Sequence, residues 1–85
     1  MEAFSYTIKC EIGIHARPAA MLVKKTQTLS SDIILSVGNR EVNAKKLLAL
    51  LKLGVTKDTR VTVRLTGIQE VKEARILEQY FKENL

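Results

Sequence analysis

Segments with two different hydrophobic periods follow one another along this chain, and their order limits the folds that it can adopt. Residues 4–10 alternate apolar and polar side chains, as a half-buried strand does. Residues 16–29 instead place apolar side chains at helical spacing. Residues 33–37 and 40–42 alternate again on either side of Gly38-Asn39, a pair that tolerates positive φ, so they predict a β-hairpin.

The second half of the chain repeats this change of period. A leucine-rich stretch over 44–53 predicts a short helix that stops at Gly54, residues 61–65 predict a fourth strand, and a helical face runs from Val71 through Ala74, Leu77 and Phe81 to the end of the sequence. The order is β-α-β-β-α-β-α. Because the strands have one polar face, we expect an α+β open-faced sandwich, with a mostly antiparallel four-stranded sheet and three helices on one side.

Size and composition exclude several classes of protein. Eighty-five residues form one small domain, 1–85, and the net charge of +5 favours acidic partners. A single cysteine, Cys10, and a single histidine, His15, cannot form an internal disulfide or a Cys/His metal cluster, so we expect neither metal nor cofactor. The N-terminus lacks a signal-peptide pattern and no apolar run is long enough to insert in a membrane, which predicts a cytoplasmic protein.

The stretch from Gly13 to Ala20 carries most of the chemical information. Gly13 permits a sharp turn out of the first strand, and Pro18 fits only the first turn of a helix. These two residues place His15 at the helix N-terminus, where free N–H groups and the positive end of the helix dipole favour anions. Arg17 adds a guanidinium suited to phosphate, and the local field favours a neutral imidazole.

A neutral imidazole beside these donors suits a transient phosphohistidine. The alternative is that His15 merely caps the helix. The rest of the chain offers no second histidine, no paired carboxylates near the loop and no Gly-rich nucleotide cradle. Hydrolysis and ATP-dependent chemistry therefore have little support, and the residues alone leave a phosphohistidine and a capping histidine both open.

The run Gly-Ile-His-Ala-Arg-Pro-Ala at 13–19 resembles the active-site motif of HPr, the histidine-containing phosphocarrier of the bacterial sugar phosphotransferase system. The resemblance extends over nearly the whole chain in length and element order. It implies that His15 accepts a phosphoryl group on Nδ1 from enzyme I and passes it to enzyme II components. It also implies that Arg17 contacts the phosphoryl group, that the backbone amides of Ala16 and Arg17 cap it, and that the protein is a monomer.

Two positions depart from the family pattern. Lys46 occupies the place where HPr proteins usually carry a serine that a dedicated kinase phosphorylates, and residues 44–54 contain no hydroxyl at all. Ile12 replaces what is often a small polar residue near the site, which predicts an altered phosphohistidine geometry or lifetime. The catabolite-repression paralogue of HPr lacks the active-site histidine, whereas this chain keeps it.

The helix over 44–53 has leucines on too many sides for one buried stripe. We assign Leu50 and Leu53 to the core. By resemblance to HPr, Leu47, Leu48 and Leu51 form a docking patch for enzyme I and enzyme II. A basic rim around this patch would speed encounter with acidic partners; it comprises Lys24, Lys25, Lys45, Lys46 and Lys52.

Two other functions remain open from the sequence. A small basic module could bind RNA across its sheet through Lys9, Arg40, Arg60 and Arg64, but the chain has only two Phe and two Tyr and no Trp for base stacking. An HPr-like protein could also carry phosphate for regulation and not for sugar uptake, and the sequence does not separate that role from transport.

Overall fold

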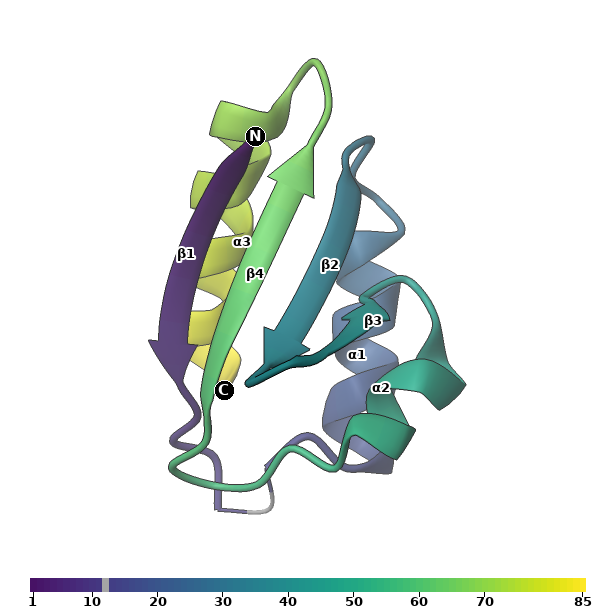
Figure 1. The fold of residues 1–85 in the computed structure, drawn as a ribbon, viewed down its shortest axis with the longest axis vertical. Coiled ribbons are helices and arrows are strands. Elements are labelled where there is room, and N and C mark those ends of the chain that lie inside the picture. The colour runs from purple at the N-terminus through teal and green to yellow at the C-terminus, as the bar shows by residue number, and fades with distance from the viewer. Residues whose placement is uncertain (12) are drawn as a thin grey trace.

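The computed structural model describes residues 1–11 and 13–85, so the predicted effect of Ile12 lies outside the described residues. The chain forms four strands and three helices in the predicted order (Figure 1). Their bounds are β1 Glu2–Thr7, α1 Ala16–Thr26, β2 Asp32–Val37, β3 Arg40–Asn43, α2 Leu47–Leu53, β4 Arg60–Thr66 and α3 Glu70–Asn84. No helix among the described residues is long and apolar enough to cross a membrane.

The four strands form one sheet in the order β1-β4-β2-β3. Every neighbouring pair is antiparallel, with Phe4 opposite Val63 and Leu35 opposite both Val63 and Val42. β4, the last strand along the chain, therefore lies inside the sheet between β1 and β2 (Figure 1). This arrangement joins the two ends of the chain into one unit and confirms the predicted fold class.

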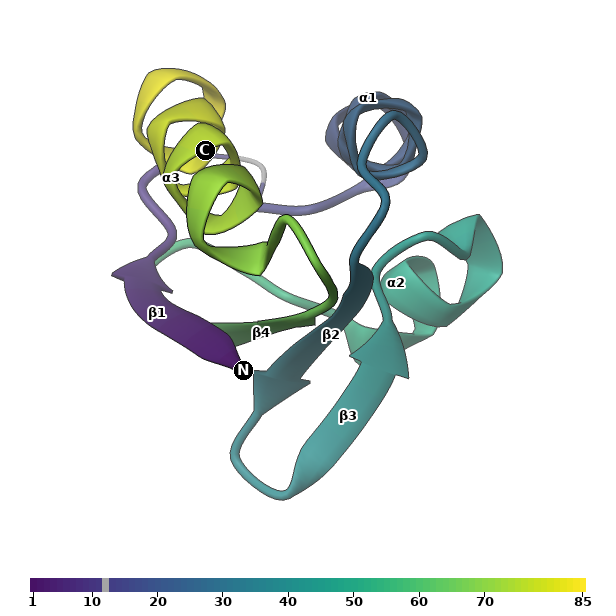
Figure 2. The same ribbon diagram turned by 90° about the horizontal axis from the view of Figure 1, so that it is seen from above.

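The helices lie on one side of the sheet, with α1 and α3 above it and α2 beside the β3 edge (Figure 2). The core between the two layers is apolar because alternate strand residues and one stripe of each helix face it. Phe81 is fully buried there, and the rings of Phe4 and Tyr6 meet it edge-on with centroids 5.5 and 5.7 Å away. Other core residues include Leu22, Ile33, Leu35, Leu50, Val61, Val63, Leu65 and Leu77.

The opposite face of the sheet is polar and open to solvent. Ser5 and Thr62 share a hydrogen bond of 3.1 Å across β1 and β4, and Arg64 pairs with Glu41 at 2.7 Å. Because Phe4, Tyr6, Tyr80 and Phe81 all pack on the helix side, the described residues give this open face no aromatic platform for stacking bases. The predicted lack of aromatic side chains on the strand surface is thus visible in the structure.

The end of α1 and the start of α2 both differ from the sequence prediction. The helix predicted over 16–29 ends at Thr26, because Thr28 and Leu29 donate to carbonyls three residues back, which tightens the chain into turns. The helix predicted over 44–53 begins at Leu47. There the amide of Lys45 donates to Asn43 Oδ1 at 2.9 Å, an Asx turn that competes with the first helical turn.

The structure also differs from the prediction in the extent of the first strand and in the buried face of the last helix. The first strand ends at Thr7, because Ile8 pairs with Asp58 and Thr59 and the amides of Lys9 and Cys10 both donate to the Leu85 carbonyl. Val71, predicted on the buried face of the last helix, is 51% exposed. Glu73 takes the buried position instead, since its carboxylate has polar partners on the loop before β2.

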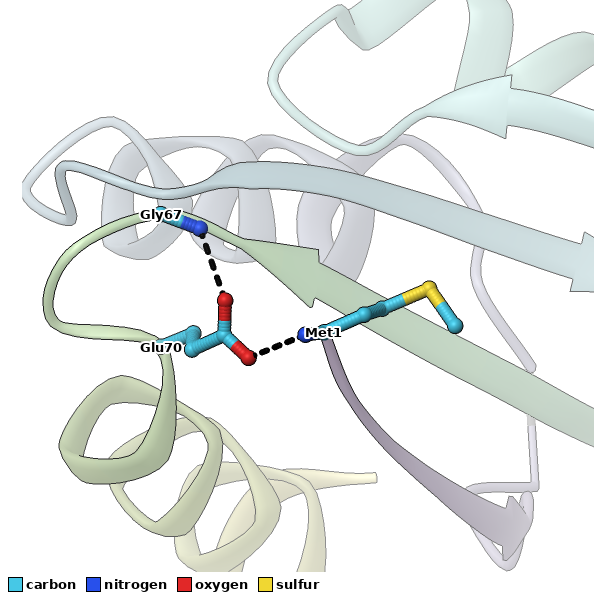
Figure 3. Close-up of polar contacts among 3 residues, drawn as sticks. All are labelled: Met1, Gly67 and Glu70. Atoms are coloured by element: carbon cyan, nitrogen blue, oxygen red, sulfur yellow. Dashed lines mark hydrogen bonds and ion pairs between the residues drawn. The ribbon is translucent and has the colours of Figure 1, made fainter.

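Carboxylates fix the first turn of α3 to the rest of the molecule. Glu70 accepts from the Gly67 amide at 3.1 Å and pairs with the amino group of Met1 (Figure 3). The amino group, followed by the Gly67 amide, lowers the pKa of Glu70. Glu73 accepts hydrogen bonds from the amides and hydroxyls of both Ser30 and Ser31. Burial raises the pKa of Glu73, but the bonds from Ser31 and Ser30 outweigh it and bring the pKa down to about 2.

Candidate functional site

His15 is the N-cap residue of α1. Its backbone is extended, with φ −93° and ψ −166°, and its carbonyl accepts the first helical hydrogen bond from the Ala19 amide at 2.8 Å. The imidazole itself makes no capping hydrogen bond and is exposed. The ring is therefore not used to stabilise the helix, which argues against the capping alternative and leaves its nitrogens accessible.

Unpaired amide donors surround this position. The amides of Ala16 and Arg17 belong to the first helical turn and have no helical acceptor, while Pro18 has no N–H. Within the described residues neither amide donates to another group, and the first turn has no acidic side chain. Arg17 is exposed and forms no ion pair with the described residues. The helix start thus offers backbone donors, a dipole and a guanidinium to an anion held at His15.

The backbone before His15 is held against the segment that follows α2. Gly13 has a φ of +64°, and a Cβ added there would lie 2.5 Å from the Val55 oxygen and 2.7 Å from Thr56 Cα. The Ile14 amide donates to the same Val55 oxygen at 3.0 Å, and the Ile14 side chain is buried. Only glycine fits this close approach at this φ, so Gly13 sets the path of the chain into His15.

Further contacts hold the start of the same loop. Asp58 donates through its amide to the Ile8 carbonyl at 2.7 Å, and the Ile8 amide donates to Thr59 at 2.9 Å. Lys57 Nζ pairs with Glu11 at 3.0 Å. The segment 55–59 therefore braces the loop on both sides of the turn, and this loop carries His15. Sequence reasoning did not find this brace, because Val55 and Thr56 have no chemical feature of their own and lie far from His15 in the sequence.

The leucines of α2 divide between core and surface as predicted, except for Leu51. Leu50 and Leu53 are buried, whereas Leu47 is 37% and Leu48 is 70% exposed. Leu51 lies between these extremes and packs against the core. Leu47 and Leu48 therefore present two neighbouring apolar side chains that a partner could contact.

The lysines predicted as one rim occupy three different places. Lys46, the N-cap residue of α2, and Lys52 are exposed on α2 itself. Lys45 turns inward, with Nζ donating to the Leu29 carbonyl at 2.8 Å, so it closes the end of α1. Lys24 and Lys25 line a groove between α1 and α3, together with Met21, Thr28 and Tyr80.

The chain matches the model of a known family. The family model described as the PTS HPr component phosphorylation site matches residues 3–83, which include all of the sheet except Glu2, and the His15 loop.

Solved structures with the same fold include relatives at moderate identity. HPr-C-His from Thermoanaerobacter tengcongensis is 31% identical over 99% of this chain and 94% of its own, with a TM-score of 0.93. The Bacillus subtilis catabolite repression protein Crh, described as a swapped, intertwined dimer, is 31% identical over 94% of this chain and 92% of its own, with a TM-score of 0.77. HPr from Bacillus anthracis shares the fold at 22% identity and a TM-score of 0.87, with coverage of 94% and 95%.

Proposed function

The chain belongs to the PTS HPr family, and from that premise we propose that His15 accepts a phosphoryl group from enzyme I and transfers it to enzyme II components for sugar uptake. The observation that carries this proposal is the position of an exposed imidazole at the N-cap of α1, unbonded by the helix and next to the free amides of Ala16 and Arg17. A nucleophile and a set of anion donors thus lie together at one place.

The chemistry needs only groups that this site contains. The lone pair of His15 Nδ1 attacks phosphorus as the P–N bond to the donor histidine breaks, and the bonding pair of that bond leaves with the donor ring. The phosphoryl oxygens then accept from the amides of Ala16 and Arg17, while the Arg17 guanidinium balances their charge. Transfer to an acceptor reverses these steps. No cofactor takes part in this scheme.

Docking would use the surface of α2. Leu47 and Leu48 offer exposed apolar area, Leu51 borders it, and Lys46 and Lys52 supply positive charge on the same helix. Lys24 and Lys45 belong to the proposed rim only at its margins, because Lys45 is bonded to Leu29 and Lys24 lies toward α3. We place this exchange in the cytoplasm, between a monomeric carrier and proteins with acidic surfaces.

A reconstituted relay tests this function. The protein is incubated with enzyme I, radiolabelled phosphoenolpyruvate and membranes carrying enzyme II, and label in the sugar is measured. We expect label in a sugar only when the carrier is present, and none with His15→Ala. Arg17→Ala should slow the relay, since the phosphoryl group loses its guanidinium contact.

The regulatory alternative is supported by the similarity to Crh, whose identity to this chain equals that of the Thermoanaerobacter protein. A regulatory carrier would become phosphorylated by enzyme I but would pass no label to any sugar. The same relay therefore separates the two roles.

The monomeric state is tested by light scattering on the free protein, which measures its molar mass. This test is needed because one solved relative is described as an HPr dimer and Crh as a swapped dimer.

A further inference from the structure

A second surface, on the helix side of the molecule and away from α2, has unexplained apolar and positive groups. Three shallow depressions there share residues and so form one continuous face. One depression, along the first half of α3, shares Arg75 and Ile76 with a middle depression. The middle one shares Lys25 and Tyr80 with the depression between α1 and α3. We call this continuous face the α1–α3 face; it comprises Met21, Lys24, Lys25, Thr28, Ile68, Gln69, Val71, Lys72, Arg75, Ile76, Gln79, Tyr80 and Glu83.

The charge of this face is strongly unbalanced. Lys24, Lys25, Lys72 and Arg75 line it, and none of them is in an ion pair with the described residues. Its single carboxylate, Glu83, accepts a hydrogen bond from Gln79 at 3.1 Å. The face thus has four positively charged side chains and one negatively charged side chain among apolar ones. This composition favours a partner that presents many negative charges in a plane.

The apolar groups of the face protrude. Ile68 is 101% exposed, Val71 51% and Met21 50%. A helical peptide lying in the groove would cover mainly the half-buried Ile76 and Tyr80 and leave Ile68 in water. A flat bilayer, in contrast, can receive the protruding side chains among its headgroups while the cations meet its phosphates.

We propose that the α1–α3 face binds the surface of an anionic lipid bilayer, without inserting a helix. From Val71 to Tyr80 the face extends about 14 Å along α3 at 1.5 Å per residue, and Ile68 lies just before that helix. α1 and α3 run antiparallel, so their N-terminal ends lie at opposite ends of the molecule (Figure 1). His15 is the N-cap residue of α1, whereas Ile68 lies just before the start of α3. A carrier held in this way keeps its phosphorylation loop free at one end. The proposal does not depend on the function proposed for His15.

Sedimentation with vesicles tests the proposal on the full chain. Vesicles of equal parts phosphatidylglycerol and phosphatidylethanolamine should bring the protein down at low salt, and vesicles of phosphatidylcholine alone should not. Each cation removed from the face should weaken binding about fivefold, so Arg75→Glu and Lys72→Glu should show clear losses. Ile68→Ser should also weaken binding because its protruding side chain no longer enters the headgroup region.

Matched variants elsewhere on the surface control for general charge and hydrophobicity. Arg60→Glu makes the same charge change as Arg75→Glu but lies on β4, and Leu48→Ser removes an exposed leucine from α2. We expect both controls to bind vesicles nearly as well as the parent. Ile68→Ser should still be phosphorylated by enzyme I in solution, which keeps a failure of this inference distinct from a failure of the carrier function.

Three outcomes would overturn the inference. The first is no binding to the phosphatidylglycerol vesicles at low salt. The second is equal loss in Arg60→Glu and Arg75→Glu, which would indicate unspecific attraction by net charge. The third comes from NMR titration with a soluble acidic amphipathic peptide: if Met21 and Ile76 shift saturably with the peptide while vesicles do not bind, the face is a protein docking site.

Discussion

The amide of Ile14 donates to the carbonyl oxygen of Val55 at 3.0 Å, so the residue before the proposed phosphoryl acceptor is joined to the second residue after α2. One end of that connection is the helix proposed to dock partners, and the other is His15. A single hydrogen bond thereby joins the segment that follows α2 to the loop that carries His15. The position of the imidazole depends on a residue forty positions away in the sequence.

Replacing Gly13 with alanine should both destabilise the protein and slow its phosphorylation. The left-handed φ costs a non-glycine residue about 1–2 kcal/mol, and the added Cβ would also press on the Val55 oxygen at 2.5 Å. Gly38→Ala is the matched control, because Gly38 has a φ of +61° but nothing within 4 Å of the added Cβ. Urea unfolding should show a larger loss for Gly13→Ala, and enzyme I should phosphorylate Gly38→Ala normally. Equal losses in the two variants would contradict the close approach described for Gly13.

Stability should fall in acid because of Glu73. Its pKa is lowered from an ordinary 4.5 to about 2, so the stabilisation is complete above the unfolded pKa and is lost as the pH falls toward the folded one. Glu73→Gln removes the charge-assisted bonds to Ser30 and Ser31 and should cost about 2 kcal/mol at neutral pH. The same variant should flatten the decline between pH 4.5 and 2, measured as the free energy of unfolding.

Glu83→Gln provides the comparison for that measurement. Glu83 is exposed and bonds only to Gln79 among the described residues, so its variant should keep the acid slope of the parent. An unchanged slope in Glu73→Gln would show that other groups control the acid transition.

The double change Leu47→Ala with Leu48→Ala should weaken phosphotransfer and leave the fold intact. Both side chains are exposed, at 37% and 70%, and a docking role predicts a higher KM for the carrier in the enzyme I reaction. Leu50→Ala, in contrast, empties a fully buried position and should cost about 2–5 kcal/mol of stability. Transfer rates equal to the parent in the double variant would count against the docking patch.

Lys46 should make this protein inert to the kinase that phosphorylates the usual HPr serine. No hydroxyl lies within residues 44–54, so incubation with that kinase and ATP should give no phosphoserine there by mass spectrometry of peptides. Lys46→Ser restores the hydroxyl at the N-cap of α2 and serves as the positive control. Phosphoserine in the parent chain would refute this prediction.

The fold was predictable because most of its signals are local. The alternation in β4 correctly separates buried Val61, Val63 and Leu65 from outward residues, and Pro18 places the start of α1 near His15. The helix bounds were less predictable, because the Asx turn at Asn43 competes with a stretch that has helical spacing. Such competition is decided by hydrogen bonds that the hydrophobic pattern does not record.

Several hydrogen bonds that hold the fold together were beyond the reach of sequence reasoning. Glu73 looks like an ordinary helical glutamate until folding brings Ser30 and Ser31 to it, and Lys45 gave no sign that it would bond to Leu29. Both depend on contacts between distant segments. The residues proposed to react could be named from the sequence because His15 and Arg17 lie on one short motif at a helix start.

The most direct test is the intact mass of the protein after incubation with phosphoenolpyruvate and a bacterial enzyme I. We predict one phosphoryl adduct that is labile in acid, stable in alkali and absent from His15→Ala, with slower formation in Arg17→Ala. If the folded parent protein carried no adduct, or if His15→Ala carried the same one, His15 would not be the phosphoryl acceptor.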